Sequence, residues 1–259
     1  GDGEGDFGSC IFKKRNAQSY FAIQTFAAPI VQTQGTAQGF HFDNATMKPI
    51  INNEGWKKAF ELYKATGKYG PPDELNMDIG DTRALFKAGR CGLIVEWGDP
   101  GTLQLDDDAK SIRGKMYAIS AVGSTEVLDR ATGKLVPVSA TTAPYAVDGI
   151  NYAPFAAFGG WAGAVNKGAD AKTKAAAYAF LSYMNQAAQS GIDVTIGATG
   201  YNPYRTSQLA STDLWVKAGM PKALADNYLG AINGAINNLN MASDMKIPGA
   251  QKYTSVVLD

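Results

Sequence analysis

The clearest hydrophobic pattern in the chain lies over residues 53–66. Its apolar positions recur at intervals of three and four residues: Trp56, Ala59, Phe60 and Tyr63. This spacing places the four side chains on one face of an α-helix. Asn53 can cap the N-terminus of that helix and Gly67 can end it, so the pattern predicts a helix over 53–66.

Three other stretches also favour helices. The segment from Tyr20 to Ile30 is apolar enough for a buried helix. A short helix is predicted over residues 82–88, capped by Asp81 and closed by Gly89. The fourth prediction covers residues 171–187 after Asp170 as cap, and its apolar face is formed by Ala177, Phe180, Leu181 and Met184.

Short apolar runs between these helices predict strands. Residues 91–95 form a short buried strand that ends in a loop at Glu96, and residues 117–160 favour strands and long loops. The glycine-rich stretch 158–163 leads into a further apolar strand. After a glycine-rich loop over 197–204 the chain is helical, with breaks predicted at Gly219, Pro221, Gly230, Gly234 and Pro248. Alternating strands and helices predict an α/β fold.

Composition narrows the function. The chain has 259 residues, 45% of them hydrophobic, which supplies a sizeable core. Its 24 basic and 24 acidic residues cancel, so the sequence lacks the concentrated positive charge that nucleic-acid binding requires. We therefore expect no nucleic-acid partner. In addition, no apolar run approaches the roughly 18 residues of a membrane span.

Few residues are available for metal or nucleophilic chemistry. The single histidine, His41, is interpreted as a half-exposed structural residue at a strand edge or turn. Asp2, Glu4 and Asp6 alternate like the start of a calcium loop, but Phe7 and Lys13 stand where glycine and glutamate are needed. Cys10 and Cys91 form either two buried thiols or one long-range disulfide. We expect no metal, no cofactor and no enzymatic activity.

Aromatic residues stand beside glycines and polar residues in three loops. Trp97 follows a predicted strand with Asp99 two positions on, Trp161 follows two glycines, and Tyr201 precedes Arg205 by four positions. Strand-end loops bind ligands in open α/β sheets, and flat aromatic faces suit sugar rings. The alternative is that each tryptophan anchors the core.

The order of several segments carries a family resemblance. These are the helix 56–67, the short helix 82–89, the strand and tryptophan loop 93–99, the segment 159–167 with the helix end 179–184, the loop 197–207 and, more weakly, Gln18–Phe21. Together they resemble the extracellular solute-binding proteins of ABC importers, in the class that includes maltose-binding protein. The resemblance spans most of residues 16–207.

The resemblance implies a periplasmic-binding-protein-like fold of two α/β lobes around a cleft. Residues 1–120 and 190–259 look like the second lobe, and residues 121–189 look like the part that returns to the first lobe. The chain then corresponds to a fragment whose missing first-lobe segment is upstream or in another chain. We expect residues 121–189 to pack away from the rest, and the strand near 162–165 to border an incomplete sheet.

The implied function is the binding of a small polar solute, a sugar or polyol, in an inter-lobe cleft that closes about a hinge. The expected ligand-binding residues are Gln18, Tyr20, Trp97, Asp99, Gly160, Trp161, Tyr201 and Arg205. The family works outside the cytoplasmic membrane with a permease or as the sensor domain of a receptor, so an extracytoplasmic location follows. The alternative is a structural or assembly component that uses the same fold without a small ligand.

Overall fold

A computed structural model describes residues 5–157 and 160–259. The acidic residues Asp2 and Glu4 at the start, and residues 158–159 of the glycine-rich stretch 158–163, lie outside the described residues. The helices are α1 (Ser19–Val31), α2 (Glu54–Thr66), α3 (Ile79–Lys87), α4 (Ala171–Met184), α5 (Ala187–Asp193), α6 (Thr206–Leu209), α7 (Asp213–Lys217), α8 (Lys222–Ile236) and α9 (Ala250–Leu258), with 3₁₀ turns η1 (Glu74–Asn76), η2 (Asp99–Leu105) and η3 (Gly197–Thr199). The strands are β1 (Phe7–Cys10), β2 (Cys91–Ile94), β3 (Gly123–Ser124), β4 (Glu126–Asp129), β5 (Lys134–Pro137), β6 (Asn151–Tyr152), β7 (Phe155–Ala156) and β8 (Ala242–Ser243).

The strands pair in two ways. Strands β1 and β2 are parallel, with Phe7 opposite Cys91 and Cys10 opposite Ile94, and β7 runs parallel to β8. The pairs β3–β6 and β4–β5 are antiparallel. Helices α1, α2 and α3 lie between β1 and β2 in the chain, which is the helical crossover that parallel strands need. The α/β prediction is confirmed.

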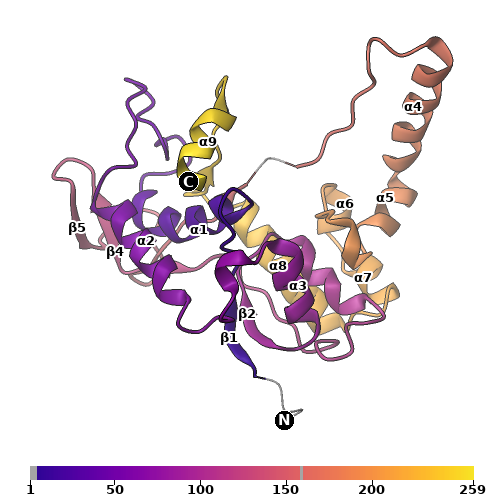
Figure 1. Ribbon diagram of the computed structural model, residues 1–259, viewed down its shortest axis with the longest axis horizontal. Coiled ribbons are helices and arrows are strands. Elements are labelled where there is room, and N and C mark those ends of the chain that lie inside the picture. The colour runs from indigo at the N-terminus through magenta and orange to yellow at the C-terminus, as the bar shows by residue number, and fades with distance from the viewer. Residues whose placement is uncertain (1–4, 158–159) are drawn as a thin grey trace.

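Helix α1 lies beside α2 in the left-hand half of Figure 1, and most of its residues are buried. It carries no charged side chain, and a helix that is apolar on all sides is stable only inside a core. Ile23 and Val31 pack with Trp56 of α2 and Leu128 of β4 in one core cluster. The buried helix predicted over 20–30 is confirmed.

Helices α2 and α3 show how caps define helix ends. The Asn53 side chain accepts a hydrogen bond from the Trp56 amide at 3.0 Å, and α2 ends before Gly67, as predicted. Helix α3, in contrast, begins three residues earlier than expected. Asp78 is its N-cap, and Asp81 lies in the first turn, where its carboxylate accepts from the Asp78 amide at 2.9 Å. Two aspartates three residues apart can each cap a helix, and here the Asp81 carboxylate reaches back to the Asp78 amide, so Asp81 lies inside the helix.

Helices α7 and α8 pack around Trp215, Met220 and Tyr228 in a second cluster. The predicted break before α8 is confirmed, because Gly219 has a φ of +103° and Pro221 is the N-cap of α8. The breaks predicted at Gly230 and Gly234 are wrong, since α8 continues through both residues to Ile236. Packing against the second cluster outweighs the modest helix penalty of two glycines.

Strands β3 to β6 lie against the rest of the molecule. Val127 and Leu128 of β4 are both buried, and Leu128 packs in the core cluster with Ile23 of α1 and Trp56 of α2. Arg130, which follows β4, donates to the carbonyl oxygens of Val31 at 3.0 Å and Gly39 at 2.7 Å, and so ties the β4–β5 hairpin to the end of α1. The expectation that residues 121–189 pack away from the rest is therefore wrong for 123–156, because this part completes the core around α1.

Residues 160–189 are much less buried than residues 123–156. Figure 1 shows α4 projecting from the rest of the molecule after a long extended segment. Asp170 caps α4 as predicted, by accepting from the Thr173 amide at 3.0 Å, but no described residue of α4 is buried. Tyr178 and Phe180 are 70% and 61% exposed. Residues 162–165 do not form the predicted strand. Among the described residues, no strand pairs with this segment.

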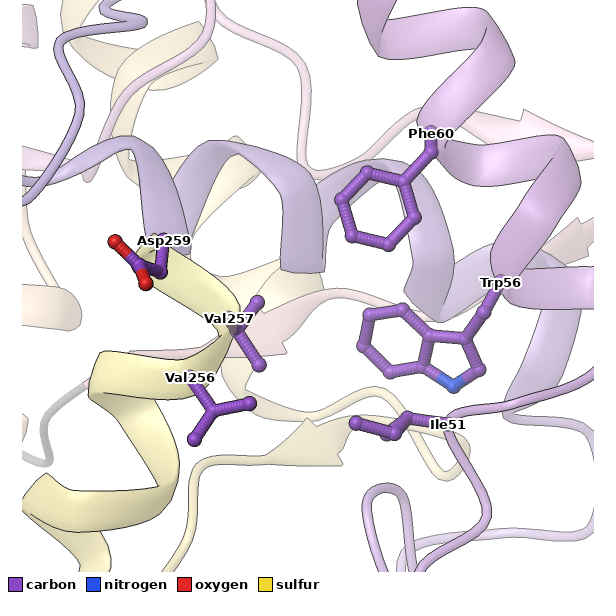
Figure 2. Close-up of a pocket in the computed structure, with 6 residues that line it drawn as sticks. All are labelled: Ile51, Trp56, Phe60, Val256, Val257 and Asp259. Atoms are coloured by element: carbon purple, nitrogen blue, oxygen red, sulfur yellow. The ribbon is translucent and has the colours of Figure 1, made fainter.

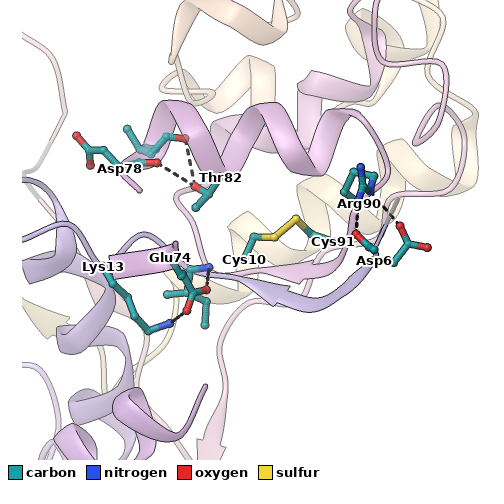
Figure 3. The surroundings of a disulfide bond; sticks show 11 residues. Asp6, Cys10, Lys13, Glu74, Asp78, Thr82, Arg90 and Cys91 are labelled. Atoms are coloured by element: carbon teal, nitrogen blue, oxygen red, sulfur yellow. Dashed lines mark hydrogen bonds and ion pairs between the residues drawn. A yellow bond between two sulfur atoms is a disulfide. The ribbon is translucent and has the colours of Figure 1, made fainter. Parts of the chain in front are cut away.

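The two cysteines form a disulfide that joins the end of β1 to the start of β2 (Figure 3). Cys10 and Cys91 are both buried, and their Cα atoms are 5.8 Å apart. Next to this bond, the Glu74 carboxylate accepts from the Ile11 amide at 2.8 Å and pairs with Lys13. The disulfide and Glu74 thus fix the direction in which the chain leaves β1. Strand β2 is less buried than predicted, because Leu93 is 50% exposed.

His41 belongs to a buried polar network and is not half-exposed as expected. Its Nε2 lies 3.1 Å from Gln24 Oε1 and 3.3 Å from the Tyr20 hydroxyl, which donates to Asp244 at 2.9 Å. Burial lowers the pKa of His41 to about 4, although the nearby Asp244 carboxylate opposes this shift. Burial also raises the pKa of the Tyr20 hydroxyl. His41 is therefore held neutral inside the fold.

This network predicts acid lability. The unfolded chain takes up a proton at His41 near pH 6.5, whereas the folded protein resists it down to about pH 4. The stabilisation is therefore complete above pH 6.5 and is lost as the pH falls toward 4, by an amount on the order of 3 kcal/mol. Urea unfolding at several pH values should show this loss in the native protein and a shallower dependence in His41→Gln. Equal slopes for both proteins would contradict the assignment to His41.

None of the helices in the described part of the chain is long and apolar enough to cross a membrane.

Candidate functional site

A small pocket lies where three strands end. Parallel pairing brings the carboxyl ends of β1 and β2 to the same edge, and the chain after β7 reaches the same place. The pocket has a volume of ≈ 50 Å³ and is lined by Phe12, Phe21, Ala22, Thr25, Val95, Glu96, Trp97, Phe155 and Ala157. We call it the strand-end pocket.

Aromatic rings make up much of its wall. Trp97 stacks on Phe12 with the ring centroids 5.7 Å apart and the planes 11° from parallel. The Phe21 ring meets Trp97 edge-on at 5.1 Å. The contact fixes the indole, which is half-buried and faces the pocket. Such flat faces suit the CH surfaces of sugars and polyols, whose hydroxyl groups need separate hydrogen-bonding partners.

A buried ionic cluster supplies the polar side of the pocket. Arg83 of α3 donates through Nε to Glu96 Oε1 at 2.9 Å and through Nη2 to Glu96 Oε2 at 3.0 Å. Its Nη1 lies 2.9 Å from Asp99 Oδ2. The Glu96 and Asp99 side chains are only 4% and 6% exposed. Burial raises the pKa of both carboxyl groups, and the Arg83 guanidinium opposes that shift.

Two of the eight predicted site residues belong to this region. Trp97 lines the pocket, and Asp99 lies behind it as the second partner of Arg83. Gln18 is the half-buried N-cap of α1, and its backbone carbonyl accepts from the Phe21 amide at 3.0 Å. Tyr20 points into the core, where it binds Asp244 and His41. Neither Gln18 nor Tyr20 is among the described residues that line the pocket.

The other four predicted residues lie elsewhere. Gly160, with a φ of +107°, is exposed, and Trp161 is 79% exposed with its indole donating to the Gly200 carbonyl at 3.2 Å. Tyr201 packs against the second cluster, the one around Trp215. Arg205 donates through Nε to Ser190 Oγ at 3.1 Å and also to the Asn185 carbonyl at the end of α4. Arg205 therefore caps α4 and joins it to the loop 197–205.

Sequence reasoning missed several residues of the pocket. Phe12, Thr25 and Phe155 come from separate segments that carry no shared motif. Glu96 stands next to Trp97 in the sequence, so its strand-end position was a usable signal. Its role depends on Arg83, which lies on a helix that no spacing rule connects to the loop. Only the fold brings these groups together.

A larger pocket of ≈ 240 Å³ lies between α2 and α9 (Figure 2). Its walls are the apolar side chains of Ile51, Trp56, Phe60, Val256 and Val257, and its described lining includes a single polar residue, Asp259. A pocket of this kind has few groups to orient a polar solute. The smaller strand-end pocket, with its aromatic rings and a held carboxylate, is the better candidate. Among the described residues, no group of three His, Cys, Asp or Glu residues could hold a metal ion.

Comparison with known proteins supports the fold. No family model matches the chain, and no curated protein matches it. A solved structure, an ABC transporter solute-binding protein from Agrobacterium radiobacter K84 in complex with ribitol, is similar with a TM-score of 0.53 and 16% sequence identity. The similarity covers 98% of this chain and 59% of that one. The chain thus has the α/β fold of a periplasmic solute-binding protein and spans 59% of the length of the protein it resembles.

Proposed function

We propose that this chain binds a sugar or polyol in the strand-end pocket. The observation that carries the proposal is the arrangement of Trp97 and Phe21 beside the Glu96 carboxylate at the ends of parallel strands. The aromatic faces can cover the apolar side of the solute, while Glu96 accepts hydrogen bonds from its hydroxyl groups. The similar solute-binding protein was solved with ribitol, which belongs to this class of ligand.

We also propose that the pocket forms one side of an inter-lobe cleft that closes about a hinge. In this proposal residues 1–120 and 190–259 build the second lobe, and residues 121–189 lead to the first. Because residues 123–156 pack on the core around α1, we propose that only residues 160–189 reach the first lobe. The exposed rings of Tyr178 and Phe180 on α4 support this, because such rings are normally covered by a partner surface. The partner is a first-lobe segment of the same protein or another chain.

An extracytoplasmic location fits the same proposal. The disulfide between Cys10 and Cys91 is typical of oxidising compartments. A solute-binding protein in that location would deliver its solute to a membrane permease or act as the sensor domain of a receptor. Binding without catalysis is proposed because Arg83 holds Glu96 as a hydrogen-bond acceptor. A structural or assembly component of the same fold is the second candidate, favoured by the exposed face of α4.

Replacing Trp97 by alanine tests the binding function. We expect affinity for the bound sugar or polyol to fall by about 1–3 kcal/mol, roughly 5- to 150-fold, because the stacking face is lost. Calorimetric titration of the full-length protein with ribitol and a panel of pentitols, hexitols and hexoses measures this change. Tyr69→Ala is the matched control, since Tyr69 is 65% exposed and lies outside the pocket lining.

Two outcomes would contradict the proposal. If none of the sugars or polyols binds the native protein, the proposed function is wrong. If the native protein binds but Trp97→Ala and Tyr69→Ala have the same affinity, the ligand lies elsewhere. Thermal unfolding of both variants establishes that they are folded, because Trp97 also packs on Phe12.

A further inference from the structure

The ionic cluster behind the strand-end pocket is unbalanced in charge. Each of three Arg83 nitrogens contacts a carboxylate oxygen, two on Glu96 and one on Asp99, at distances of 2.9–3.0 Å. One positive charge therefore faces two negative charges, and all three guanidinium nitrogens are engaged with these carboxylates. When both carboxyl groups are ionised, the cluster carries a net charge of −1.

Glu96 presents this charge to the pocket. Its side chain lies in the pocket wall, where Oε2 accepts from Arg83 and, at 3.2 Å, from the Trp97 amide. Oε1 accepts from Arg83 Nε alone among the described contacts, so it keeps a lone pair for a ligand donor. Burial raises the pKa of Glu96, and the charge-assisted bonds to Arg83 oppose this rise and favour the ionised form. A solute group that meets Glu96 must therefore be a donor.

The described lining of the pocket holds no cation that would offset this charge. Among the described residues that line the pocket none is basic, and its remaining members are aromatic, aliphatic or, at Thr25, hydroxylated. A carboxylate or phosphate on the solute would meet a like charge in a partly desolvated place, which is unfavourable. A hydroxyl group can donate to Glu96, and an ammonium group can both donate and neutralise the cluster.

From this charge balance we infer that the strand-end pocket selects solutes by charge: it accepts neutral and amino-substituted polyols and rejects sugar acids and sugar phosphates. The inference rests on the proposed function, and it names the solute class of the same site. Arg83 acts as a positioning residue that holds Glu96, and Asp99 supplies the second negative charge that leaves the cluster anionic.

Matched solutes that differ in one group provide the test. The first set is ribitol, ribonate and 1-amino-1-deoxyribitol, and the second is glucitol, gluconate and 1-amino-1-deoxyglucitol. In the full-length protein at neutral pH and low salt, we expect the acid of each set to bind at least about tenfold more weakly than its polyol. The amine should bind as tightly as the polyol or more tightly.

Glu96→Gln assigns the selectivity to the cluster. Glutamine keeps a hydrogen-bond acceptor of the same shape and removes the charge, so the ratio of amine to acid affinity should fall about tenfold or more. Polyol affinity should change much less than this ratio. Glu54→Gln is the control, because Glu54 is 59% exposed and forms only a surface contact with Lys57 at 3.8 Å. Asp99→Asn removes a charge behind the pocket wall and should also lower the ratio of amine to acid affinity. This variant tests the inference independently if Glu96→Gln does not fold.

The outcomes separate the inference from the function. If polyols bind and acids bind equally well, the charge inference is overturned while the binding function stands. If acids are rejected but Glu96→Gln and Asp99→Asn leave the amine-to-acid ratio unchanged, the selectivity has another origin and the inference is again overturned. If no member of either set binds, the proposed function and the inference fall together.

Discussion

Replacing Arg83 by methionine should lower the free energy of unfolding by about 3–5 kcal/mol. The substitution leaves the Glu96 and Asp99 carboxylates buried without a cation, and breaking a buried ion pair on one side strands the remaining charge in a poorly solvated place. The apolar stem of methionine preserves much of the packing of the arginine side chain, so the loss of charge compensation dominates.

Urea denaturation measures this effect, and two further variants isolate its cause. The triple variant Arg83→Met, Glu96→Gln and Asp99→Asn removes all three charges and should recover part of the lost stability. Lys57→Met removes a cation from an exposed pair and should change stability by less than about 0.5 kcal/mol. A loss below about 1 kcal/mol for Arg83→Met would show that Arg83 does not stabilise the buried Glu96 and Asp99 carboxylates.

Removing the disulfide should have an effect of similar size. Cys10 and Cys91 are separated by 81 positions, and closing a loop of that length lowers the entropy of the unfolded chain by an amount worth about 4 kcal/mol. The double variant Cys10→Ala and Cys91→Ala should lose about this much unfolding free energy. Because the bond joins β1 to β2 (Figure 3), the variant should also bind its solute more weakly, since both strands lead into the strand-end pocket.

Reductant provides the control for this prediction. Dithiothreitol should destabilise the native protein toward the stability of the double variant and should leave the double variant unchanged. Equal stability of the native protein with and without reductant, after the thiols are shown to be free, would rule out the disulfide as a main source of stability. Because reduction leaves both cysteine side chains in place, any further loss in the alanine double variant comes from the buried volume and not from the bond.

Local signals were sufficient to place α1 and α2 and the start of α4. Asn53 and Gly67 mark the ends of α2, and Asp170 marks the start of α4, because a cap acts within one turn of its own helix. The apolar composition of residues 20–30 predicted the burial of α1, since a helix that is apolar on all sides is stable only inside a core. The order of these elements was enough for the α/β class and for the family resemblance.

Local signals do not show which distant segment a polar loop residue meets. Asp99 and Arg205 are polar residues in loops, which sequence reasoning assigns to a ligand. In the structure Asp99 pairs with Arg83, and Arg205 caps the end of α4. Tyr20 is equally polar at its tip, yet its hydroxyl is satisfied inside the core by Asp244. A buried hydrogen bond and a ligand contact require the same side chains, so residue type cannot distinguish them.

The sequence by itself determined the positions of α1 and α2, the start of α4, the caps of α2 and α4, the α/β class and the place of Trp97 after a strand, because each depends on neighbours within a few positions. Tertiary structure alone decided that β1 pairs with β2, that Cys10 meets Cys91, and that Arg83 holds Glu96 against the pocket. It also left α4 exposed. These contacts join segments far apart in the chain, and the free energy that selects them comes from burial and pairing in the folded molecule, which no local spacing records.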